Sequence, residues 1–219
     1  MRRREVLGAA VSAPAAALAG RAAQMASAPA AQLRRRVEIY KLHQAACGRL
    51  FSDAGEWVGP PTENTPRVRL WHSVSLLSSP DTRDKGNAVI RRAFADRAGL
   101  SAFSHFEFCA AAQILAKSRQ ALAPASEELL AGLLREHLTR PGNIRWMGYN
   151  DNFPAMENVA QCLGGDLLSD SAARQRGMDG LAGLLEYFGR RGFLAEYTSP
   201  TYTPITLLCF ADIAEYARP

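Results

Sequence analysis

The stretch Pro154-Ala-Met-Glu-Asn-Val-Ala-Gln-Cys-Leu-Gly-Gly165 predicts a short helix over 154–163, with a proline in its first turn and two glycines at its end. A second helix is expected over 171–190, because the apolar residues there recur at helical spacing and Arg190-Arg191-Gly192 closes the segment. Two helices separated by a short helix-terminating segment form a helical hairpin. The same rhythm recurs along the chain at intervals of roughly twenty to thirty residues, which predicts stacked hairpins.

The rest of the chain supports an all-α fold, since no stretch alternates apolar and polar residues long enough to make a convincing sheet. The segment 51–80 is rich in Pro, Gly and Ser, and is expected to be a long irregular connection that packs through Trp57 and Trp71. Besides the two helices above, helices are expected over 32–50, 84–98, 103–122, 126–139 and 204–219.

The first residues have the order of a secretion signal. Arg2, Arg3 and Arg4 precede a weakly apolar, Ala-rich stretch over 9–19, and small residues suited to cleavage follow. This predicts a disordered twin-arginine signal peptide over 1–23, a helical domain over 24–219, and a periplasmic or secreted location. A basic disordered tail is the alternative. The apolar stretch is too short to cross a membrane, so no span is expected in the mature chain.

Charge and cysteine content narrow the function classes. Of the five net positive charges, three lie in the signal, and the remainder shows no basic block interleaved with aromatics, so a nucleic-acid partner is not expected.

The four cysteines are widely spaced in apolar helical contexts, at Cys47, Cys109, Cys162 and Cys209. This spacing favours buried free thiols over a zinc site, with one or two disulfides as the alternative. Neither a metal nor a cofactor is expected.

Two loops concentrate polar and aromatic residues just before predicted helices. The first spans 145–154 and leads into the helix at Pro154. One polar residue suffices to cap a helix, and the surplus here has the residue types that bind sugar hydroxyls beneath an aromatic ring. The candidates in this loop are Trp146, Tyr149, Asn150, Asp151 and Asn152.

The second loop spans 193–204. Glu196 lies among apolar and aromatic neighbours, which suit a carboxyl group to proton transfer near neutrality, and Tyr197 and Tyr202 are able to stack or donate hydrogen bonds. His105, at the start of an aromatic helix, is a further candidate for the same cleft. In the alternative view, prolines stiffen these turns and the polar groups only cap helices.

The sequences Tyr149-Asn-Asp-Asn-Phe-Pro-Ala-Met and Glu196-Tyr-Thr-Ser-Pro-Thr-Tyr resemble the helix-entry loops of the six-hairpin glycosidase-like proteins. The resemblance covers about 88–217 and matches no single family. It implies an α/α toroid, complete or truncated at its C-terminus, with a cleft at one end, a carbohydrate ligand and an acid/base pair. It puts Asp151 and Glu196 forward as that pair.

The expected function is therefore an exported carbohydrate-active enzyme, with Asp151 and Glu196 as catalytic acid and base. Trp146, Tyr149, Asn150, Asn152, Tyr197, Tyr202 and His105 are expected to contact the sugar. Two alternatives stay open. A polysaccharide lyase would use Tyr197 or Tyr202 as base and Asn150 or Asn152 to neutralise a uronate, and a non-catalytic module would bind a glycan or a partner protein. The sequence leaves the oligomeric state open.

Overall fold

The computed structural model describes residues 30–61, 65–95, 104–139 and 150–217. The predicted signal peptide lies outside the described residues. The chain divides into two compact units, 1–43 and 44–219, and the second unit is the one described below. Helix α2 (Ala30–Arg49) spans the division between them. No helix among the described residues is long and apolar enough to cross a membrane.

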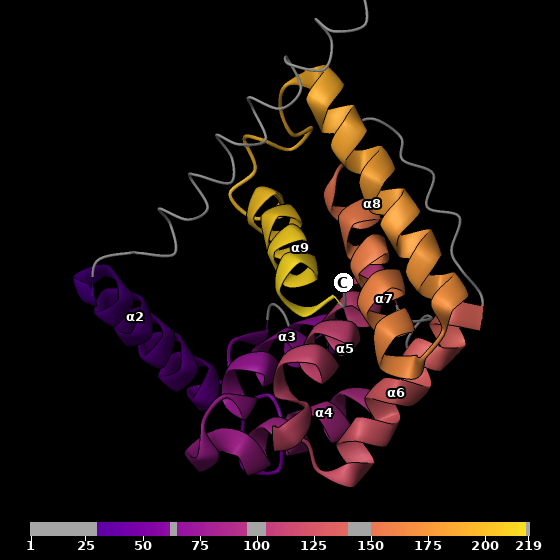
Figure 1. The fold of residues 1–219 in the computed structure, drawn as a ribbon. Coiled ribbons are helices and arrows are strands. Elements are labelled where there is room, and N and C mark those ends of the chain that lie inside the picture. Colours follow the sequence, from indigo (N-terminus) through magenta and orange to yellow (C-terminus); the bar gives the residue numbers. More distant parts are fainter. Residues whose placement is uncertain (1–29, 62–64, 96–103, 140–149, 218–219) are drawn as a thin grey trace, which may run out of the picture. The chain divides into compact units, whose positions relative to one another are not determined.

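The second unit is built from helical hairpins, which confirms the all-α prediction (Figure 1). Its described residues form no strand beyond an isolated bridge between Phe51 and Trp57. Each of three hairpins joins two consecutive α-helices, and one further helix follows. The elements are α3 (Pro66–Leu77), the 3-10 turn η2 (Pro80–Thr82) and α4 (Arg83–Ala95); α5 (His105–Ser118), η3 (Arg119–Ala121) and α6 (Pro124–Thr139); α7 (Asn152–Leu168) and α8 (Ser171–Arg191); and α9 (Tyr202–Tyr216).

Helices α5, α7 and α9 run in the same direction. Near their first turns, the His105 ring of α5 lies 5.6 Å from the Phe153 ring of α7. Near their last turns, Ala116 of α5, Leu167 of α7 and Tyr216 of α9 line one cavity. We call the end at which these helices begin the start end, and the end at which they stop the finish end.

The second helix of a hairpin runs back along the first. In the α5–α6 hairpin, Phe108 stacks on His137 at one end, with ring centroids 3.9 Å apart. At the other end, Arg119 of η3 pairs with Glu127 at 2.7 Å. The hairpins therefore repeat one motif, a forward helix followed by a returning helix, as the sequence rhythm predicts.

A single large hydrophobic cluster joins these helices. It draws on α3 to α9 and includes fully buried aliphatic side chains, each worth about 1.5–3 kcal/mol relative to exposure. The largest of these side chains are Leu70, Leu77, Ile90, Ile114, Leu130, Leu134, Met156, Val159 and Leu163. This shared core fixes the positions of the helix starts on which the candidate site is built.

The prediction of an irregular connection over 51–80 was wrong, because α3 lies within it. Pro66 occupies the first turn of this helix, where its fixed φ and missing N–H are tolerated, so a residue taken for a breaker is a helix start. This helix matters for function, because it places Arg67 and Trp71 at the start end.

The predicted end of the helix at Gly164-Gly165 was also wrong, since α7 continues to Leu168. Gly165 serves close packing instead, together with Gly177 of α8. A Cβ added to Gly165 would lie 2.5 Å from the backbone nitrogen of Arg174, and one added to Gly177 would lie 2.5 Å from that of Cys162. The two helices of the hairpin therefore approach backbone to backbone. The helix ends at Ser169, whose φ of 59° is left-handed.

Candidate functional site

The described parts of the two predicted loops meet at the start end. The Glu196 Oε2 atom accepts hydrogen bonds from the backbone N–H of Asp151 at 2.9 Å and of Asn152 at 3.1 Å. In return, an Asp151 carboxylate oxygen accepts a hydrogen bond from the backbone N–H of Ala195. We call this reciprocal set of contacts between Asp151, Asn152, Ala195 and Glu196 the clasp.

Glu196 supplies a helix cap from a distant part of the chain. The cap residue of α7, Asp151, makes no side-chain hydrogen bond to its own helix, and the first turn holds no acidic residue. A carboxylate at a helix start is favoured by the unpaired N–H groups and by the helix dipole. Capping therefore accounts for the position of Glu196, which is also held by a hydrogen bond from the Thr203 hydroxyl to its carbonyl oxygen.

Asp151 is fully buried in the clasp. One of its carboxylate oxygens accepts the Ala195 hydrogen bond, and Oδ1 has no hydrogen-bond partner among the described residues. An unpaired buried oxygen is costly, so Asp151 is an unusual cap residue. The assignment of Asp151 and Glu196 as an acid/base pair stays a prediction, and the contacts here give both carboxylates a role in joining the loop to α7.

A buried carboxylate lies one turn deeper, between two histidines. Glu157 of α7 places Oε1 3.0 Å from Nε2 of His137, and Oε2 3.4 Å from Nδ1 of His105. Gln161, one turn further along, donates to the same Oε1 at 2.7 Å. Glu157 and His137 are buried, whereas the His105 side chain is 29% exposed. His105 is therefore a partly accessible imidazole with a buried carboxylate behind it.

This setting stabilises the charged form of Glu157. Burial alone raises the pKa of its carboxyl group. The contact with His105 at 3.4 Å, which is longer than a hydrogen bond, the hydrogen bond and charge of His137, and the Gln161 amide together outweigh burial and lower that pKa to about 2. Behind them, the Arg176 Nε donates to the Gln161 oxygen at 3.2 Å, so the network continues from α7 to α8. Glu157 is thus an anion at neutral pH.

Aromatic and basic side chains of α3 and α7 gather around Phe106, the residue that follows His105 in α5. Phe106 is in edge contact with Trp71 of α3, with centroids 5.4 Å apart, and with Phe153 of α7, at 5.6 Å. The Arg67 guanidinium carbon lies 4.9 Å from the centroid of the Phe106 ring. Phe106 is buried, while Arg67, Trp71, His105 and Phe153 are half-buried around it. We call these five residues the aromatic face.

The other predicted contact residues have mixed placements. Asn150 is half-buried and Asn152 is buried, with its backbone N–H used by the clasp. Tyr197 is 65% exposed and Tyr202 is 43% exposed, and the Tyr197 ring contacts Phe193. Trp146 and Tyr149 lie outside the described residues. Of the candidates, Asp151, Asn152, His105 and Glu196 lie at one end of the helices.

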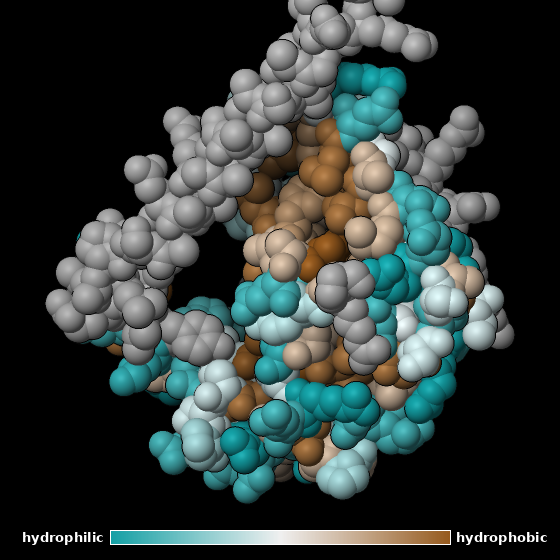
Figure 2. All heavy atoms as spheres, in the orientation of Figure 1, coloured by the Kyte–Doolittle hydropathy of each residue, from teal (hydrophilic) through white to brown (hydrophobic). Residues whose placement is uncertain are grey.

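Exposed apolar side chains lie on the loop 193–201 and on α9, which follows it. Phe193 of the loop and Leu207 and Leu208 of α9 are about half exposed. Figure 2 shows hydrophobic side chains gathered over α9 and the neighbouring helix. Together with Tyr197 and Tyr202, they make the loop side of the start end a surface on which flat, partly apolar ligands are able to pack.

Sequence reasoning missed Glu157, His137, Arg67 and Trp71 as members of the site. Glu157 had a detectable signal, because it is an acidic residue in the otherwise apolar helix start Pro154-Ala-Met-Glu-Asn-Val. His137 had none, since its relation to Glu157 depends on how α6 packs against α7. Arg67 and Trp71 were missed because α3 itself was missed.

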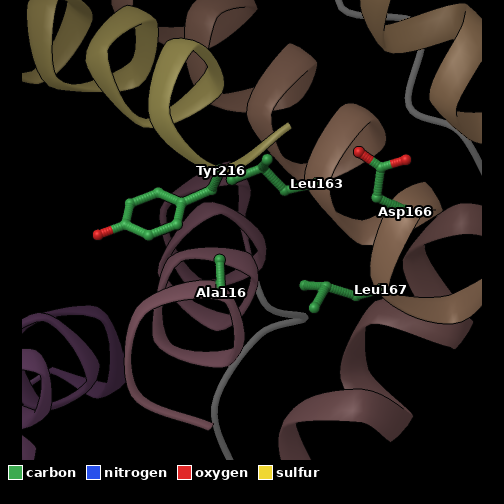
Figure 3. Close-up of a pocket in the computed structure, with 5 residues that line it drawn as sticks. All are labelled: Ala116, Leu163, Asp166, Leu167 and Tyr216. Atoms are coloured by element: carbon green, nitrogen blue, oxygen red, sulfur yellow. The ribbon is translucent and has the colours of Figure 1, made fainter. Parts of the chain in front are cut away.

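The finish end holds a separate cavity of about 200 Å3, lined by Ala116, Leu163, Asp166, Leu167 and Tyr216 (Figure 3). Its one carboxylate, that of Asp166, pairs with Arg174 at 2.9 Å. The prediction of buried thiols is confirmed, because all four cysteines are buried and none forms a disulfide. No residue of the clasp or of the aromatic face lines this cavity.

Comparison of the chain with family models, with curated proteins and with solved structures found no match. The site is therefore interpreted from its own geometry.

Proposed function

We propose that the protein is an exported carbohydrate-active enzyme that binds a poly- or oligosaccharide on the aromatic face and hydrolyses its glycosidic bonds, with His105 taking a proton from the attacking water while the departing sugar oxygen gains one. The observation that carries the proposal is the pairing of His105, partly accessible, with the buried anion of Glu157 at 3.4 Å. Export rests on the predicted signal peptide, and the α/α toroid on the resemblance of the loops.

The aromatic face supports a carbohydrate ligand. Sugar rings have apolar faces that pack on aromatic side chains, and hydroxyl groups that need polar partners at the edge. Trp71 and Phe153 are half-buried, so each keeps part of its ring accessible while the rest is fixed by contact with Phe106. Rings that are already fixed lose little side-chain entropy when a ligand packs on them.

The pairing with Glu157 supports proton transfer. A buried carboxylate fixes the orientation of a neighbouring imidazole and stabilises the imidazolium formed when the ring accepts a proton. His105 has such a partner at Nδ1, and the ring also lies against Phe153. In this proposal His105 is the catalytic residue, and Glu157 is a positioning residue that acts through it.

Hydrolysis through Asp151 and Glu196 is the second proposal, favoured by the direct contact between their two segments in the clasp. Paired glycosidase carboxylates lie roughly 5–10 Å apart on either side of the bond to be cleaved. For this chemistry, substrate binding would have to release both carboxylates from the backbone N–H groups that they hold. The His105 proposal requires no such release.

The test is an activity screen of the full chain against neutral and acidic polysaccharides, reading both new reducing ends and ultraviolet-absorbing unsaturated products. We expect His105→Gln to lower turnover by at least about a hundredfold, as removal of a general base does. His72→Gln is the matched control, because His72 contacts Cys47 and Phe51, which belong to a different hydrophobic cluster.

The outcomes separate the proposals. Loss of turnover in His105→Gln with retained activity in Glu196→Gln supports the first proposal, and the reverse pattern supports hydrolysis through the clasp. Unsaturated products would indicate a lyase. If the wild type binds glycans without cleaving any, the protein is a binding module and both catalytic proposals fall.

A further inference from the structure

We infer that the sugar bound on the aromatic face carries an anionic group, a carboxylate or a sulfate, and that Arg67 binds this group. The inference rests on the proposed function and adds the charge class of the substrate. It is argued from the contacts of Arg67, from the charges around it, and from its position beside the aromatic rings.

Arg67 is placed by its own helix and by one aromatic ring. It follows Pro66 in the first turn of α3, and its guanidinium carbon lies 4.9 Å from the centroid of the Phe106 ring. A guanidinium held over a ring keeps N–H donors at its edge, where a carboxylate or sulfate accepts two parallel hydrogen bonds. The side chain is half-buried, so such an anion is able to reach it.

Among the described residues, no carboxylate pairs with Arg67. Arginines elsewhere in the same unit have such partners, with Arg119 held by Glu127 at 2.7 Å and Arg174 by Asp166 at 2.9 Å. A half-buried arginine in contact with an aromatic cluster and without an acidic partner has a binding site open for an external anion.

The local charge around Arg67 also favours an anion. The first turn of α3 contains no acidic residue, so no side chain of that turn neutralises the positive end of its dipole. In α5, Glu107 is held in a capping box, where Oε2 accepts a hydrogen bond from the Ser104 backbone N–H at 2.8 Å. Glu157 is anionic, but it faces His105 and His137.

The aromatic rings explain why the anion should belong to a sugar rather than be a free ion. Trp71 and Arg67 contact the same ring, Phe106, and Phe153 contacts it as well. A sugar ring packed on Phe153 would therefore lie beside His105, and the Phe106 ring joins that position to the guanidinium of Arg67. A free inorganic anion would use Arg67 alone and gain nothing from the rings.

The test compares oligosaccharides that differ in charge, using calorimetric titration of the His105→Gln protein so that no substrate is consumed. The probes are an oligogalacturonate, which carries carboxylates, a sulfated carrageenan oligomer, and a neutral cello-oligosaccharide. Each is titrated into proteins carrying Arg67→Gln, Arg67→Lys or Arg119→Gln. The last substitution removes the same charge at the opposite end of α5 and is the matched control.

We expect one acidic probe to bind at least about ten times more tightly than the neutral probe, and Arg67→Gln to weaken its binding by roughly ten- to a hundredfold, the range for a lost charge-assisted hydrogen bond. Arg67→Lys should lose less, and Arg119→Gln should bind as the parent does. The acidic probe that binds identifies the group as a carboxylate or a sulfate.

Three results would overturn the inference: equal binding of neutral and acidic probes, unchanged binding in Arg67→Gln, or no binding of any probe. None of them by itself removes the proposed function, which fails only if the wild type also leaves every polysaccharide in the activity screen uncleaved. Far-ultraviolet circular dichroism and a melting curve for each variant show that a change in binding is not a loss of fold.

Discussion

The finish end and the start end of the parallel helices both bury carboxylates, but they pair them differently. At the finish end, Asp212 contacts Lys117 at 2.6 Å and Asp166 contacts Arg174 at 2.9 Å. At the start end, within the described ranges, Asp151, Glu157 and Glu196 contact backbone N–H groups, imidazoles and an amide, and none contacts a lysine or an arginine.

This difference separates a structural end from a reactive one. An ion pair with a lysine or an arginine keeps its charges over the whole physiological pH range, and it fixes two helices together. A carboxylate held by imidazoles contacts groups that are able to accept and release protons, as acid/base chemistry needs. The following predictions test whether the two ends differ in this way.

The largest effect is expected at the finish end. Asp212→Ala removes the partner of Lys117 and also the acceptor of the Gln113 side-chain N–H at 2.7 Å. Leaving a largely buried charge unpaired should lower the free energy of unfolding by about 3–5 kcal/mol. Urea denaturation measures the loss, and carbohydrate cleavage by the folded fraction should be unchanged. A loss below about 1 kcal/mol would show that this end is not held by its ion pair.

The next effect is a pH dependence at the start end. Because the folded-state pKa of Glu157 is about 2, below its ordinary value of 4.5, its charge stabilises the protein above pH 4.5 and the stabilisation is lost as pH falls through about 2. The difference in unfolding free energy between wild type and Glu157→Gln should shrink by about 3 kcal/mol across that window.

Urea titrations at several pH values check this dependence. Glu128→Gln is the control, because Glu128 forms an exposed pair with Arg135 and should show no comparable change. A gap between wild type and Glu157→Gln that stays constant from about pH 6 downward would mean that the histidines do not stabilise the Glu157 anion.

A smaller loss of stability is expected when either of two helix caps is removed, one supplied by a distant loop and one supplied locally. Glu196→Ala removes the cap that the distant loop gives to α7, and Asp170→Ala removes the local cap of α8, where Oδ1 accepts from the Ala173 N–H at 2.9 Å. Each should cost about 1 kcal/mol or somewhat more. Only Glu196→Ala should also speed hydrogen exchange over 193–201, since it alone detaches a loop. Equal exchange in both variants would contradict the clasp.

The smallest effect is expected from a surface pair. Arg119→Gln removes an ion pair with Glu127 in which the arginine side chain is 57% exposed. Exposed pairs of this kind contribute about 0–1 kcal/mol, so the melting temperature should barely move. A loss comparable to that of Asp212→Ala would show that exposure does not separate strong from weak pairs in this protein.

Local patterns predicted most helices and the meeting of the two loops, but not the partners within the site. Apolar spacing located α8, and the repeated direction of the hairpins brought residues 151 and 196 to the same end. Gly165 was misinterpreted as a helix end because its role depends on the backbone of α8. His137 and Glu157, 20 residues apart, meet only through the packing of α6 on α7, which no local pattern encodes.

The clasp has a consequence for the order in which the protein folds. It joins residues 44 and 45 positions apart, on either side of the whole α7–α8 hairpin. Closing a loop of that length costs entropy that is recovered only after both helices have docked, so the clasp should form after the main folding barrier. Substitutions at Glu196 should then speed unfolding while leaving the refolding rate nearly unchanged. Stopped-flow refolding and unfolding of Glu196→Ala would place the clasp in the folding sequence.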